Sequence, residues 1–198
     1  MKVSLSILIP TIHQKNDKWE EYLDLLVKQI QEYFYSNPMF WNWIEIKSVD
    51  NMLVNPAWNK LVAECEWDII LILNDDIIIQ ELVFETLATL KPWQVYCPNF
   101  SRKDQFNKIY SHNWENIVWF CFWMYKSDWQ DIPSELQLWF WDNYIYEYMK
   151  HNILWGWFIH HHESKSLNNP EQKEKFDKII EQDKTNWKSI YETIRFNS

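Results

Sequence analysis

Glycine is almost missing from this sequence, which has one glycine among 198 residues beside 15 tryptophans. At average usage a chain of this length has about 14 glycines, and tryptophan is not among the common residues. An α/β protein needs glycine where the backbone takes positive φ, in tight turns and at helix ends. Because the deficit nearly equals the excess, we expect many tryptophans to be glycines of a gene that reads UGA as glycine. The alternative is a truly tryptophan-rich protein, whose tryptophan codons would be mostly UGG.

Cysteine and positive charge are also scarce. The three cysteines, Cys65, Cys97 and Cys121, include no CxxC pair, so they fit reduced core residues better than a disulfide framework or a zinc site. The net charge of −9 excludes a broad grip on nucleic acid, which needs clustered Lys and Arg. No apolar run approaches the roughly 20 residues of a membrane span, and the first one stops at Pro10 without a cleavage site. We expect a cytoplasmic location.

The length and a hydrophobic content of 47% indicate one domain with a sizeable core. Apolar runs and helical spacings predict strands and helices that alternate along the first half. The strands are expected at residues 3–9, 43–49, 68–73 and 94–97, and the helices at residues 19–35, 56–65 and 81–90. This alternation is typical of a doubly wound α/β fold, with a Rossmann-like, mostly parallel central sheet flanked by helices.

The second half of the chain is less regular. Its patterns predict strands at residues 117–125 and 153–159 and a helix at residues 142–151. After Pro170 the composition becomes polar and charged, which predicts one or two amphipathic surface helices. We therefore expect a single domain over residues 1–169, divided near residue 99, and a helical tail over residues 170–198.

Polar residues follow three of the predicted strands. They are Pro10 and Thr11, Asp50 and Asn51, and Asn74, Asp75 and Asp76. In such sheets ligands bind beyond the carboxyl ends of the strands, so these residues are expected to converge on one crevice. Neighbouring carboxylates are hard oxygen ligands that suit Mg²⁺ or Mn²⁺ bound together with substrate phosphates. In the alternative, one aspartate caps the following helix and the other is solvated.

Three stretches of the first half carry a family resemblance: SILIPT, SVDN and NPAWNKLVAECEWDIILILNDD. Together they resemble the nucleotide-binding half of a GT-A glycosyltransferase, most closely the family-two-like enzymes. The resemblance implies a GT-A fold, with residues 1–99 as the nucleotide-binding half and residues 100–169 as the acceptor half. Leu61 and Trp67 depart from the family pattern, which has glycine at both positions; UGA misreading accounts for Trp67 but not for Leu61.

The resemblance also implies which residues contact the donor, a nucleotide-diphosphate sugar that is expected to be UDP-linked. It gives the nucleoside pocket and its floor to Pro10, Thr11, Asp50, Asn55 and Asn59, and further donor contacts to Asn74 and Asp75. Asp76 would hold the Mn²⁺ or Mg²⁺ that bridges the donor diphosphate. Asn74 stands at the first acid of the family motif, where an amide binds ribose or metal more weakly than a carboxylate.

In the second half, the stretches WFCFWMYKSDW and WFWDNYIYEYM resemble the acceptor side of the same family. Asp142 is the candidate general base, because a carboxylate at a helix N-terminus is favoured in its ionised form. Its alternative role is that of an ordinary helix cap, and Glu147 is a weaker candidate base.

Three consecutive histidines end the predicted strand at residues 153–159. A histidine near the C-terminus completes the metal site of several GT-A enzymes, so the resemblance makes His160 or His162 a candidate ligand. Alternate residues of a strand share a face, which separates these two from His161. The alternative is a surface loop whose histidines bind nothing.

The resemblance as a whole implies a metal-dependent glycosyltransferase that inverts the anomeric centre of its sugar donor. The acceptor, a glycan, a lipid or a protein, stays open. Two other functions also stay open: a catalytically silent GT-A-like binding module, and a nucleotidyltransferase, although the Gly- and Arg-rich phosphate loop usual in the latter is missing after Ile9.

Overall fold

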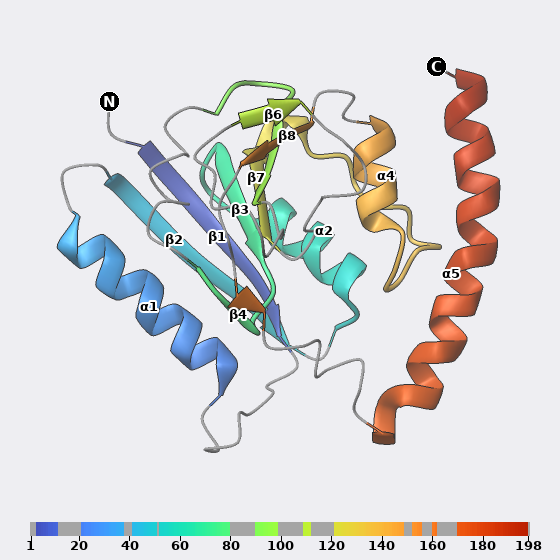
Figure 1. Cartoon of the computed structure of the whole chain (residues 1–198), viewed down its shortest axis with the longest axis horizontal. Coiled ribbons are helices and arrows are strands. Elements are labelled where there is room, and N and C mark those ends of the chain that lie inside the picture. Colours follow the sequence, from blue (N-terminus) through green and yellow to red (C-terminus); the bar gives the residue numbers. More distant parts are fainter. Residues whose placement is uncertain are drawn as a thin grey trace.

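The computed structural model describes residues 3–11, 21–37, 41–50, 52–79, 90–98, 109–111, 121–148, 152–155, 160–161 and 170–197. Within these ranges the chain forms a seven-stranded sheet, a small two-stranded sheet and helices on both sides (Figure 1). The helix predicted at residues 81–90 lies outside the described residues except for its last position.

The central sheet has the strand order β2-β1-β3-β7-β5-β8-β6. Its strands are β1 (Val3–Thr11), β2 (Trp41–Asp50), β3 (Ile69–Leu73), β5 (Val95–Pro98), β6 (Ile109–Ser111), β7 (Cys121–Tyr125) and β8 (Asn152–Trp155). β1 pairs in parallel with β2 and β3, and β5 pairs in parallel with β8. β7 is antiparallel to β3 and β5, and β6 is antiparallel to β8. All strands except β6 and β7 therefore run in one direction, which confirms the predicted mostly parallel sheet.

Helices cover both faces of this sheet. α1 (Tyr22–Ser36) packs on one face, and α2 (Val54–Glu64) and α4 (Trp141–Tyr148) pack on the other. The segment predicted as one or two helices forms the single helix α5 (Pro170–Asn197), which lies outside α4 in Figure 1. None of the described helices combines the length and the apolar character that crossing a membrane requires.

Each face of the sheet has its own hydrophobic core, because successive side chains of a strand point to opposite faces. Leu5, Ile7 and Ile9 of β1 pack with Leu26 and Ile30 of α1 on the first face. β3 contributes to both cores and is buried at all of its positions, as predicted for a strand in the middle of the sheet.

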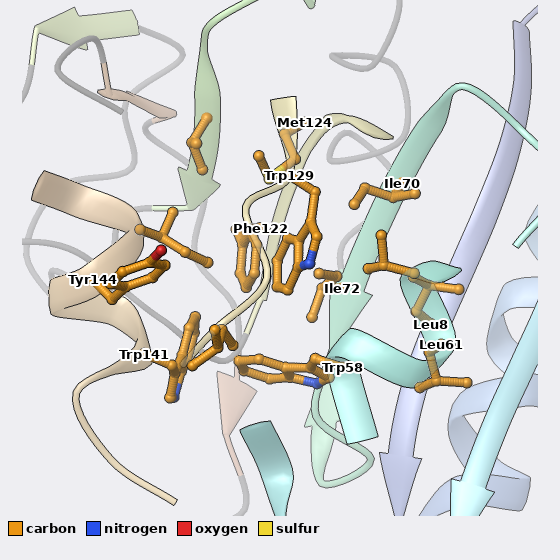
Figure 2. Packing of buried hydrophobic residues seen from close by; sticks show 14 of the residues in the cluster. Leu8, Trp58, Leu61, Ile70, Ile72, Phe122, Met124, Trp129, Trp141 and Tyr144 are labelled. Carbon is orange, nitrogen blue, oxygen red and sulfur yellow. The ribbon is translucent and has the colours of Figure 1, made fainter. Parts of the chain in front are cut away.

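The second core is rich in aromatic side chains (Figure 2). The rings of Trp58 and Trp141 meet edge to face, with 4.0 Å between centroids, and Phe122 lies 5.7 Å from Trp58 and 5.3 Å from Trp141. Trp58 of this core and Trp123 of the first core are fully buried, yet among the described residues neither indole N–H has a hydrogen-bond acceptor. The packing at these positions therefore favours an aromatic side chain. The buried indole N–H groups without acceptors make tryptophan less stable there than an aromatic side chain without a polar N–H.

The cysteines are free and buried, as expected from the sequence. Burial raises the pKa of the thiols of Cys65, Cys97 and Cys121, so they stay protonated at neutral pH. Cys121 belongs to the first core, and Cys65 and Cys97 belong to the second.

Two predicted element boundaries, the end of β1 and the start of α2, differ from the observed ones. In both cases the element includes a proline that was expected to mark its limit. β1 was expected to stop before Pro10 but continues to Thr11, pairing Pro10 with Val49 of β2. Its pairing with β3 ends at Leu8, so the missing N–H of Pro10 breaks no ladder on that side. α2 begins at Val54, two residues before Pro56, which still lies in the first turn, where backbone N–H groups have no partner inside the helix.

Positive φ angles occur at two of the described residues, Trp93 (62°) and Phe140 (63°). Trp93 lies in the turn before β5, and Phe140 immediately precedes α4. The bend at Trp67, where glycine was expected, has negative φ, so its backbone is open to any residue. The backbone conformation thus favours glycine over tryptophan at position 93 and does not do so at position 67.

Candidate functional site

The carboxyl ends of β1, β2 and β3 meet at one edge of the sheet. The register pairs Thr11, the last residue of β1, with Asp50, the last residue of β2. The Thr11 hydroxyl donates a hydrogen bond of 2.6 Å to Oδ2 of Asp75, which follows β3. Thr11 therefore stands between a carboxylate of β2 and a carboxylate of the β3 end, and Pro10 lies buried just before it.

The acidic segment after β3 differs in burial from residue to residue. Asn74 and Asp75 are half-buried, and Asp76 is 3% exposed. A buried aspartate requires compensating partners, because the charged form loses its hydration. Asp76 therefore lies inside the fold and not on an open surface.

A short strand, β4 (Ile77–Ile78), begins directly after Asp76. It pairs antiparallel with β9 (His160–His161), with Ile77 opposite His161 and Ile78 opposite His160. The histidine segment predicted from the sequence is thereby placed beside the end of the acidic segment, at the lower end of the sheet in Figure 1. His162 lies outside the described residues.

A glutamine of α1 anchors this small sheet. Gln29 donates from Nε2 to the carbonyl oxygen of Ile79 at 2.6 Å and accepts from the N–H of Ile79 at 3.2 Å. A side-chain amide that satisfies both backbone groups of one residue acts as a two-point clamp. Gln29 thus fixes the chain three residues after Asp76, a contact that helical spacing alone did not reveal.

The two asparagines of α2 contact the chain of the second half. Asn59 donates to the carbonyl oxygen of Ile132 at 2.8 Å and accepts from its N–H at 2.9 Å. Asn55, which is 1% exposed, donates from Nδ2 to the carbonyl oxygen of Trp139 at 3.3 Å, and its backbone N–H donates to Gln137. The asparagines predicted to form the pocket floor therefore hold residues 132–139 against α2.

The candidate base and its alternative lie on α4. Asp142 is the second residue of that helix, close to its positive end, and Glu147 is half-buried one turn further on. The first turn is closed by a hydrogen bond of 2.9 Å from the N–H of Tyr144 to the carbonyl oxygen of Phe140. Asp142 thus stands at a helix N-terminus, the backbone position expected from the sequence.

The acidic residues at this edge have the chemistry of ligands for a divalent cation. The residues described in the structure contain no group of three or more His, Cys, Asp or Glu side chains placed to hold a metal ion. Mg²⁺, however, is commonly bound through one or two carboxylates together with substrate phosphates. Asp75 and Asp76 match that second arrangement in residue type and in position at a strand end.

No family model and no curated protein matches the sequence. Solved structures do match. TarS of S. aureus, solved as residues 1–349, superposes with a TM-score of 0.51 at 11% identity over 78% of this chain and 58% of the solved TarS chain. HddC of Yersinia pseudotuberculosis, solved in complex with GMP-PN, gives a TM-score of 0.46 at 9% identity over 87% of this chain and 97% of its own. The architecture shared with TarS is the GT-A-like glycosyltransferase fold, so the fold predicted from the sequence is confirmed.

Proposed function

We propose that this chain is a metal-dependent glycosyltransferase that uses a nucleotide-diphosphate sugar, with UDP as the expected nucleotide. One observation carries the proposal: Thr11 joins the strand ends of β1 and β3 through its hydrogen bond to Asp75, and the register sets Asp50 beside it. Strand ends at this edge are where an open α/β sheet binds its ligand.

In this proposal the polar residues of the edge have separate tasks. Asp50, at the exposed end of β2, contacts the nucleoside, and Thr11 orients Asp75 toward the donor. Asp75 and Asp76 are adjacent acidic residues at a strand end, so a divalent cation beside them would offset their negative charge. His160 or His162 would complete that site, because β9 pairs with β4, which begins directly after Asp76.

A bound Mn²⁺ or Mg²⁺ would supply Lewis-acid stabilisation of the departing diphosphate. The chain's own residues prepare the other side of the reaction. Asp142, at the N-terminus of α4, would take the proton of the acceptor hydroxyl, because a helix N-terminus favours an ionised carboxylate. Asn55 and Asn59 act on this half by holding the segment that leads to α4.

Calorimetric titration of UDP, with and without Mn²⁺, tests the proposal. We expect UDP to bind only with the metal, and Asp76→Ala to lose that binding. Asp68→Ala is the matched control, because Asp68 is exposed and lies just before the opposite end of β3. UDP binding of equal strength without metal would indicate a silent binding module. A folded protein that binds no UDP under either condition would refute the UDP-sugar donor.

A further inference from the structure

Residues 137–139, which lead toward α4, are held from two sides. On one side, Asn55 of α2 bonds the carbonyl oxygens of Gln137 and Trp139. On the other side, the carboxylate of Asp183 on α5 accepts the backbone N–H groups of all three residues. The distances to its oxygens are 3.0 and 3.1 Å for Gln137, 2.7 Å for Leu138 and 2.8 Å for Trp139.

Asp183 differs from the other acids of its helix. Its side chain is 1% exposed, whereas Asp177 and Glu181 of α5 face solvent. Three successive N–H groups form a concave donor site that suits an anion, and hydrogen bonds to an ionised acceptor are stronger than neutral ones. The burial of Asp183 is therefore offset by the backbone of the segment that it holds.

Two further contacts join α5 to the same part of the chain. The ring of Trp187 stacks on Phe140 with 5.9 Å between centroids and 10° between planes. Asn186 donates a hydrogen bond of 2.7 Å to the carbonyl oxygen of Glu135. One face of α5 thus contacts the chain from Glu135 to Phe140, the residue of positive φ after which α4 begins.

We propose that Asp183 is a positioning residue for the acceptor half of the site. Asp183 holds the backbone of residues 137–139, which directly precede Phe140. The carbonyl oxygen of Phe140 accepts the hydrogen bond that closes the first turn of α4, and Asp142 lies in that turn. The inference rests on the proposed function, because Asp142 matters only if the chain transfers a group to an acceptor.

The test compares Asp183→Asn with Asp177→Asn, a matched change at an exposed position of the same helix. Asparagine keeps the size of the side chain but places an N–H donor against backbone N–H groups. Hydrogen exchange followed by mass spectrometry is expected to accelerate over residues 137–148 in Asp183→Asn, with β1 and β3 unchanged. Asp177→Asn is expected to match the parent protein throughout.

Kinetics provide a second readout. With UDP-glucose, UDP-galactose and UDP-N-acetylglucosamine as probes, water replaces the unknown acceptor and free UDP is measured. In this step the water oxygen bonds to the anomeric carbon, the bond from that carbon to the UDP oxygen breaks, and Asp142 takes the proton. A misplacement of about 1 Å costs roughly 10²-fold in rate, so Asp183→Asn should lower kcat to about that extent and leave the KM for the donor unchanged.

The outcomes separate the two proposals. Local exchange over residues 137–148 together with a fall in kcat at constant KM supports a positioning role. Unchanged exchange there, or faster exchange spread equally over β1 and β3, overturns it. If the parent protein neither binds UDP with Mn²⁺ nor releases UDP from the probes, the proposed function fails, and the exchange data still decide whether Asp183 anchors the segment.

Discussion

Trp93 offers a direct test of the idea that tryptophan stands where the fold needs glycine. Its φ of 62° lies in the left-handed region, where a Cβ atom costs about 1–2 kcal/mol. The side chain is 64% exposed, so little packing is lost when it is shortened. We compare Trp93→Gly with Trp93→Ala, because both remove the indole and they differ only in the Cβ atom.

Trp43 is the matched control, since it is 61% exposed and lies in β2 with an ordinary negative φ. At an ordinary position glycine is less stable than alanine by roughly 0.5–1 kcal/mol, because the unfolded chain gains freedom. That term is common to both sites and cancels between them. We subtract the free energy of unfolding of the alanine variant from that of the glycine variant at each site. This value should be more favourable to glycine at Trp93 than at Trp43 by the strain alone, about 1–2 kcal/mol.

Urea and thermal unfolding of the four variants measure this difference. For a domain of 150–250 residues, each kcal/mol shifts Tm by about 2–4 °C, so the two sites should differ by roughly 2–8 °C. The same glycine-minus-alanine difference at both sites would refute the strain argument. Sequencing the gene is the companion measurement: a UGA codon at position 93 is expected, and a majority of UGG among the tryptophan codons would end the recoding hypothesis.

Two further predictions concern hydrogen-bonded side chains. Asn59→Ala should destabilise the fold by about 1–3 kcal/mol, because the backbone of Ile132 loses a hydrogen-bond donor and an acceptor. A urea titration measures this loss, with Lys60→Ala at an exposed position as the control. A loss of UDP affinity at unchanged stability would contradict the prediction. Burial opposes the charge of Glu45, but hydrogen bonds from the Glu66 N–H, Lys47 and Ser6 outweigh it and lower its pKa below 4.5. The pKa of Glu45 is thus lower in the folded protein than in the unfolded chain. The resulting stabilisation is fully present above the unfolded-state pKa and is lost as the pH falls through the folded-state pKa. Glu45→Gln should therefore reduce stability at neutral pH and not in acid. An equal loss at both pH values in urea titrations would contradict this assignment.

The first half of the fold could be predicted because its signals are local. Apolar runs identified β1 and β3, alternation identified β2, and the polar residues after each strand indicated which edge of the sheet they share. The hydrogen bond between Thr11 and Asp75 bears out that convergence for β1 and β3. Roles toward a donor or a metal remain predictions, because they depend on a ligand and not on periodicity.

The contacts that arrange the second half could not be predicted in the same way. Asp183 lies in a charged stretch that reads as a solvated helix face, and nothing near it in sequence marks it as buried. Asn59 and Gln29 each satisfy backbone groups more than 45 residues away, at Ile132 and Ile79. Such partners are set by how elements pack together, which hydrophobic spacing does not encode.

The anchoring of residues 137–139 by Asp183 also has a consequence for the order in which the protein is made. Asp183, whose carboxylate accepts a hydrogen bond from the N–H of Trp139, is translated 44 residues after Trp139. At roughly 5–20 residues per second, the delay is about 2–9 s. During that interval β1, α1, β2, α2 and β3 are already synthesised, while the peptide groups before α4 still lack their partner. The β1, β2 and β3 part of the sheet can therefore form on the ribosome before residues 137–139 are anchored, and those residues stay open to proteases and chaperones until α5 docks.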